Sequence, residues 1–202
     1  MKKILATVLI TAAAGIAYAA PETYTIEPTH TFVNYEVKHF GTSTNRGRFG
    51  EIEGSITVDR AAKTGSAKIV VHPGKVSTGV GAMDAHLQGK DFFNVAQYAQ
   101  AVFTGEQFSF DKQGNVSAIT GKLDMLGSSH PVTLKAKNAN CYINPMVKKQ
   151  VCGGDYEAVI DRSAWGMNYG VGMMGATGEV KLVIQVEAIK HDAAALAEPA
   201  AS

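Results

Sequence analysis

The sequence predicts an all-β domain of about eight antiparallel strands, arranged as an up-and-down barrel or as a sandwich. Apolar and polar residues alternate over most of the chain after residue 22, which is typical of strands with one buried and one solvated face. Turn-forming residues separate the alternating segments, and most segments follow one another directly, which favours antiparallel pairing of neighbours.

The strands are predicted in order along the chain. The first is residues 33–39, where Val33, Tyr35 and Val37 alternate with polar residues. The remaining alternating segments are residues 52–58, 67–71, 101–103, 119–125, 132–137, 156–161 and 180–188. Turn chemistry at 59–65 and 111–115 joins successive strands, and residues 127–129 predict a short hairpin.

One segment departs from the period of two. Residues 84–97 carry apolar side chains at Leu87, Phe92 and Phe93, a spacing that fits a short helix or helical turn between an early and a later strand.

The two ends of the chain do not belong to the predicted barrel, which we place at residues 20–190. Lys2 and Lys3 precede an uncharged, mostly apolar run and a final Ala17-Tyr18-Ala19, so residues 1–19 are predicted to be a signal peptide. The run is too short for a membrane-spanning helix, so we expect a cleaved, exported product. Residues 191–202 are Ala-rich without an apolar face, and we expect them to be disordered.

Charge and cysteine content exclude several classes. Cleavage would remove two lysines and change the formal net charge from +1 to about −1, which gives no electrostatic basis for binding nucleic acid. In an exported chain Cys141 and Cys152 are predicted to form a disulfide, and their spacing argues against a reactive dithiol. Two distant thiols without a nearby histidine do not predict a metal site.

Catalytic signatures are weak. The chain has no Gly-x-Ser-x-Gly, no His-Glu-x-x-His and no phosphate-binding loop. Asp84 and His86 could form an acid–base pair, but a structural hydrogen-bonded pair is the commoner interpretation. His39 falls on the apolar side of its strand, as a buried polar group near one barrel end or as a contact to a ligand head group.

Several motifs occur together in a fixed order. They are 30–39 (HTFVNYEVKH), 47–49 (GRF), 84–87 (DAHL), 91–93 (DFF), 123–127 (LDMLG), 131–134 (PVTL), 161–163 (DRS) and 165–167 (WGM). Together they resemble the YceI-like family of bacterial periplasmic polyisoprenoid-binding proteins, and neisserial members in particular. The resemblance covers nearly all of the mature chain.

This resemblance implies an extended, lipocalin-like, eight-stranded antiparallel β-barrel with a short helical segment. It also implies a periplasmic binding or transport protein for a long isoprenoid lipid, of the ubiquinone or polyprenyl phosphate type, with no catalytic residues and no cofactor. A barrel of this size either fills itself with side chains or holds one ligand. Composition alone favours the packed core, and the resemblance favours the ligand.

On this interpretation an apolar tunnel holds the lipid. We expect its lining to comprise Val33, Tyr35, Val37, His39, Phe40, Phe49, Ile52, Leu87, Phe92, Phe93, Tyr98, Phe103, Met125, Leu126, Trp165, Met167, Met173 and Met174. Arg46, Arg48 or Arg162 could receive the polar head at the mouth.

Alternative hypotheses are an enzyme acting on an isoprenoid or other amphiphile, and a stress-response protein with a packed barrel. A homodimer is a further hypothesis, since an open mouth or edge strand favours cover by a second copy. Transient contact with a membrane is another.

Overall fold

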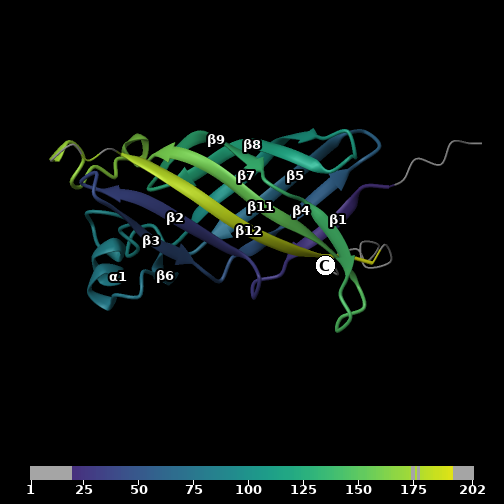
Figure 1. Ribbon diagram of the computed structural model, residues 1–202, viewed down its shortest axis with the longest axis horizontal. Helices are drawn as coiled ribbons and strands as arrows, with labels where there is room; N and C mark the ends of the chain where they lie inside the picture. Colours follow the sequence, from purple (N-terminus) through teal and green to yellow (C-terminus); the bar gives the residue numbers. More distant parts are fainter. Residues whose placement is uncertain (1–19, 174–175, 177, 193–202) are drawn as a thin grey trace, which may run out of the picture.

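The computed structural model describes residues 20–173, 176 and 178–192, and most of these residues lie in strands (Figure 1). The strands are β1 (Glu22–Ile26), β2 (Phe32–His39), β3 (Ser43–Phe49), β4 (Glu53–Asp59), β5 (Thr64–Val71), β6 (Val76–Ser77), β7 (Ala101–Phe110), β8 (Val116–Met125), β9 (Ser128–Ala136), β10 (Asn140–Ile143), β11 (Gln150–Asp161) and β12 (Glu179–Lys190). The helical elements are η1 (Pro73–Lys75), α1 (Gly81–Gln88) and η2 (Arg162–Trp165).

The first six strands form three long strands, each interrupted once. β1 and β2 follow one another along the same edge of β12, while β1 pairs with β4 and β2 pairs with β3. β5 pairs with β4, and β6 pairs with β3. The breaks therefore lie next to one another in the wall, because the strands on both sides of each break stay paired.

These three long strands, β7, β8, β9, β11 and β12 make a closed eight-stranded antiparallel barrel. Successive strands pair as neighbours, and β11 pairs over Val151–Asp161 with β12, which returns to β1 and β2. β10 adds to the β11 edge beyond β9. The predicted fold is confirmed: the long strands turn their apolar faces towards a common interior.

Two local features shape the barrel wall. At the first break the buried hydroxyl of Thr31 donates to the carbonyl of Glu187 and accepts from its N–H, both at 3.1 Å. Where β7 passes β8, a Cβ on Gly121 would lie 2.0 Å from the carbonyl oxygen of Thr104. Only glycine allows that close approach of the two backbones.

The helical excursion is shorter and earlier than predicted. α1 ends at Gln88, with Gly89 as its C-cap, and the chain then turns back through residues 89–98. Phe92 and Phe93 therefore lie in turns, where the Phe93 N–H donates to the carbonyl of Leu87 at 3.0 Å. Figure 1 shows α1 at one end of the barrel, beside β3 and β6.

The predicted disulfide is confirmed: Cys141 and Cys152 are bonded and face each other across β10 and β11. The hairpin that they join projects at the barrel end opposite α1 (Figure 1). The predicted signal peptide, residues 1–19, lies outside the described residues, as do residues 193–202 of the predicted tail. The first two tail residues are described: the His191 N–H donates to Thr23, and Asp192 pairs with Lys149.

Candidate functional site

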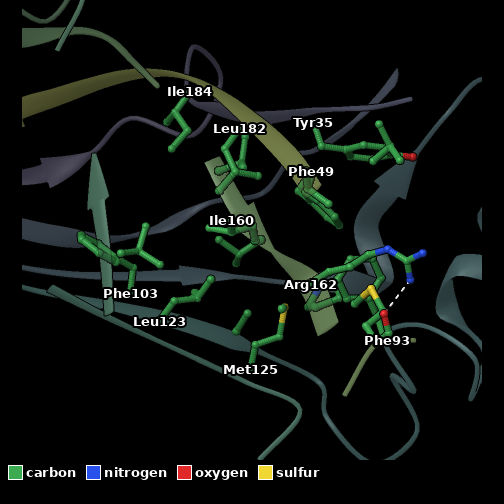
Figure 2. Close-up of a pocket in the computed structure, with 18 of the residues that line it drawn as sticks. Tyr35, Phe49, Phe93, Phe103, Leu123, Met125, Ile160, Arg162, Leu182 and Ile184 are labelled. Atoms are coloured by element: carbon green, nitrogen blue, oxygen red, sulfur yellow. Dashed lines mark hydrogen bonds between the residues drawn. The ribbon is translucent and has the colours of Figure 1, made fainter. Parts of the chain in front are cut away.

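A cavity of about 460 Å³ runs inside the barrel, within the range of small-molecule sites. Every long strand contributes to its wall, and the side chains that enter it are almost entirely aliphatic or aromatic (Figure 2). Because successive residues of a strand point to opposite faces, the alternation noted in the sequence supplies this apolar lining. The cavity can therefore accept a hydrocarbon chain without burying charged groups along its middle.

Most of the predicted lining residues lie on the cavity wall. They are Val33, Tyr35, Val37, His39, Phe40, Phe49, Ile52, Leu87, Phe92, Phe93, Phe103, Met125 and Met167. The aromatic members pack on one another at the α1 end, where the rings of Phe49 and Phe93 meet edge to face at 5.3 Å.

Four predicted residues are placed elsewhere. Leu126 occupies a two-residue turn between β8 and β9, where its positive φ of 52° takes it out of the strand alternation. Trp165 is buried in η2, donates its indole N–H to the carbonyl of Leu123 and packs against His130. Tyr98 packs beside the same turn, and Met173 is largely exposed. Met174 lies outside the described residues.

Aliphatic residues of the last strands were missed as lining. Ile160 of β11 and Leu182, Ile184 and Val186 of β12 form much of the wall (Figure 2). These residues alternate with mostly polar ones in the sequence, whereas the predicted lining consisted mostly of aromatic and methionine residues. Alternation alone does signal an inward face, so it could have found them.

The cavity opens at the α1 end. The exposed residues on its wall are Lys38, His39, Phe40, Met83, His86 and Tyr169. They come from the end of β2 and the turn that follows it, from α1 and from the segment after η2, which Figure 1 shows at the same end of the barrel. At the other end, the lining residues Ile26, Thr31, Ala67 and Tyr156 are buried. We call the first group the mouth.

Most polar groups on the wall, and all its charged ones, lie at the mouth end. His39 is exposed there and stacks on Phe40, so it is not a buried polar group. Burial, and then the charge of Asp84, raises the pKa of the Tyr35 hydroxyl, which stays a neutral hydrogen-bonding group. Arg162 also lines the cavity, although it is buried.

The other two candidate head-group arginines face away from the cavity. Arg46 pairs with Glu36 at 2.8 Å on the outer face, and the guanidinium of Arg48 lies 4.6 Å from the ring centre of Phe32. Neither belongs to the cavity wall.

Asp84 and His86 do not form the acid–base pair that an enzyme would need. Asp84 accepts from the N–H and hydroxyl of Thr78, at 2.7 and 2.6 Å. His86 pairs with Asp91 at 3.2 Å and packs between the rings of Phe92 and Tyr169. Each group therefore has a structural partner of its own.

Glu27, His30 and Glu187 form a cluster of potential metal ligands at the β1–β2 break, with donor atoms within 4.8 Å of one another. The Glu27 carboxylate already accepts from the backbone of Thr29 and His30 and from the His30 ring. These bonds fix the local turn.

Within the described part of the chain, no helix has the length and apolar character needed to cross a bilayer.

Solved structures share this architecture. The Campylobacter jejuni YceI protein matches with a TM-score of 0.65 at 24% identity, over 77% of this chain and 91% of that one. BcnA of Burkholderia cenocepacia matches with a TM-score of 0.60 at 24% identity, over 81% and 98%. A polyisoprenoid-binding domain from Saccharophagus degradans matches with a TM-score of 0.57 at 13% identity, over 83% and 98%.

Curated relatives are more similar in sequence than these solved structures are. The protein YceI of Salmonella arizonae is 33% identical over 188 residues, which cover 93% of this chain and 95% of that protein. The protein YceI of Salmonella paratyphi B matches to the same extent. The model of the YceI-like domain matches residues 24–188, from the first strand of the barrel almost to the end of the last. With barrel, cavity and sequence in agreement, the chain belongs to the YceI-like family.

Proposed function

We propose that this protein binds the tail of a long isoprenoid lipid inside the barrel and carries it through the periplasm. The single observation that supports this most is the cavity of about 460 Å³ with its continuous apolar wall. Moving a hydrocarbon tail from water into such a wall is favourable by about 25 cal/mol for each Å² buried. Family membership and the polyisoprenoid-binding neighbour from Saccharophagus degradans add support, and they favour a binding protein over an enzyme.

The finer parts of the proposal are the cargo and the compartment. The cargo is an isoprenoid with an oxygen-bearing head, of the ubiquinone or polyprenyl phosphate type. The periplasmic location rests on the signal-peptide pattern of residues 1–19 and on the disulfide, which an oxidising compartment maintains.

Loading is proposed to take place during transient contact of the mouth with a membrane. Phe40 and Met83 are each 38% exposed and also line the cavity, so the apolar wall continues onto the surface there. A tail that crosses directly from bilayer to cavity avoids exposure to water, which would oppose its transfer.

Native mass spectrometry tests the cargo. Protein purified from the periplasm is expected to carry one isoprenoid, and delipidated protein is expected to take up one added equivalent. Ile184→Lys places a charge on the cavity wall and is expected to abolish uptake, whereas the adjacent, outward-facing Gln185→Lys is the matched control. Failure of the folded wild type to take up any isoprenoid would refute the proposal.

Vesicle co-sedimentation tests the membrane contact. Replacing Phe40 and Met83 by serine is expected to weaken binding to lipid vesicles several-fold. The control replaces Ile143 and Met146, which are exposed apolar residues on the hairpin at the opposite barrel end. If only the control variant lost vesicle binding, the membrane contact would lie at the hairpin end of the barrel. That result would contradict the mouth as the docking surface.

A further inference from the structure

Arg162 is the one charged side chain that is buried among the described residues, with 8% of its surface exposed. It follows β11 directly and begins η2, so its backbone is fixed: its N–H donates to the carbonyl of Gly178, and its own carbonyl accepts from Met167. A position this rigid holds the side chain in one place at the mouth end of the cavity wall (Figure 2).

The guanidinium lacks a carboxylate partner among the described residues. Its Nη1 and Nη2 donate to the carbonyl oxygens of Met167 and Tyr169, each at 2.6 Å. The neighbouring carboxylate of Asp161 instead accepts the N–H and the hydroxyl of Ser163. A guanidinium has more N–H donors than two carbonyls accept, so donors remain for another acceptor.

Leaving a cation buried without an anion is costly, and proteins normally pair such a group. The two carbonyls orient the guanidinium plane, while the Phe92 ring lies 5.6 Å from its central carbon. Burial lowers the pKa of Arg162, and the negative charge of Asp161 partly offsets this by raising it. Arginine nevertheless stays protonated at any physiological pH. The site is therefore a preoriented set of N–H donors at the edge of an apolar cavity.

We propose that Arg162 binds the head group of the cargo. Its N–H groups donate hydrogen bonds to oxygen acceptors of an amphiphile whose tail fills the barrel. This inference rests on the proposed isoprenoid binding and adds the chemistry of the head. Phosphate and quinone carbonyl oxygens both satisfy it, because each accepts hydrogen bonds and donates none when ionised or oxidised. An ammonium head is rejected, since it would place like charges together.

The experiment compares four probes with the same number of prenyl units: an isoprenoid hydrocarbon, an isoprenoid quinone, a polyprenyl phosphate and an isoprenoid amine. Dissociation constants are measured for wild type and Arg162→Met. The variant is expected to bind the quinone, the phosphate or both about 10- to 100-fold more weakly. Its affinity for the hydrocarbon stays within about twofold, and its affinity for the amine increases.

The arms separate the two head groups: a loss confined to the phosphate identifies a phosphate head, and a loss confined to the quinone identifies a carbonyl head. Arg48→Met is the matched control, since it removes an arginine that lies off the cavity wall. If Arg162→Met does not fold, Arg162→Lys serves in its place, because a lysine keeps the charge but loses the planar, forked donor geometry.

Equal weakening for all four probes would show that Arg162 only supports the surrounding loop, and unchanged affinities would also overturn the inference. In both cases wild-type binding of the hydrocarbon would leave the proposed function standing. Failure of wild type to bind any of the four probes would instead refute the proposed function together with the inference.

Discussion

Filling the cavity is expected to limit the length of tail that it accepts. Ala67 of β5 is buried on the cavity wall, away from the mouth, and its cross-strand partner is Gly105. Gly105 places no side chain directly opposite, whereas on β4 the cross-strand partner of Ala67 is Ile56, so we expect a phenylalanine ring at this position to turn into the cavity. We expect Ala67→Phe to fold, with a loss of stability of about 1–3 kcal/mol because the larger side chain crowds its neighbours, and to displace about one prenyl unit from the cavity.

The magnitude follows from the hydrocarbon that is displaced. One prenyl unit contains five carbons, and at about 0.8 kcal/mol for each buried CH₂ its transfer is worth about 4 kcal/mol. Ordering the additional rotatable bonds and imperfect packing remove about 1–2 kcal/mol. The remaining 2–3 kcal/mol corresponds to a loss of affinity of about 30- to 150-fold for the longest tail that wild type accommodates.

The assay is a titration with a series of isoprenoids that differ by one prenyl unit. Wild-type affinity is expected to rise with tail length and then to level off, and Ala67→Phe is expected to level off one unit earlier. Ala62→Phe, in the exposed β4–β5 turn, is the matched control. If Ala67→Phe is folded and binds the longest tail as tightly as wild type does, the tail does not occupy this part of the barrel.

Three further predictions concern stability, each measured by urea unfolding. Replacing Cys141 and Cys152 by serine removes a cross-link between residues 11 apart and is expected to cost about 3 kcal/mol; an unchanged midpoint would contradict this. Gly121→Ala places a Cβ 2.0 Å from a carbonyl oxygen and is expected to cost about 1–3 kcal/mol; a wild-type midpoint would show that the strands separate without cost. Burial, and then a hydrogen bond to Glu22, raises the pKa of Tyr24 to about 12. Its stabilising contribution is therefore complete below pH 10 and is lost as the pH rises towards 12. Tyr24→Phe should lack this alkaline loss, and an unaltered slope would exclude Tyr24 as its source.

The barrel itself could be predicted because most of its strands carry period-two alternation, but four strands, β1, β3, β6 and β10, lacked that signal. β1 is only five residues long, and β10 has four. β3 reads Ser-Thr-Asn-Arg-Gly-Arg-Phe, with one large apolar residue, and it is a strand because β2 and β6 supply its hydrogen bonds. Pairing with neighbours decided these segments, and a single sequence does not display it.

The site was predicted in outline. Inward positions on regular strands, such as Tyr35 and Phe103, could be read from alternation, whereas Trp165 and Leu126 depend on a 3₁₀ turn and a hairpin turn that reverse the expected face. Burial of Arg162 had no local signal at all, because it results from two carbonyls in the segment that follows η2. Residues that act through tertiary contacts were thus the ones that the sequence pattern left ambiguous.

A chamber whose accessible wall residues all lie at one end behaves like a blind pocket rather than a pipe. Any guest that enters tail-first must back out along the same path, so an occupied molecule has to be emptied before it is refilled. Turnover would then depend on what grips the outermost atoms of the guest, and an acceptor could compete for those atoms while the rest is still inside.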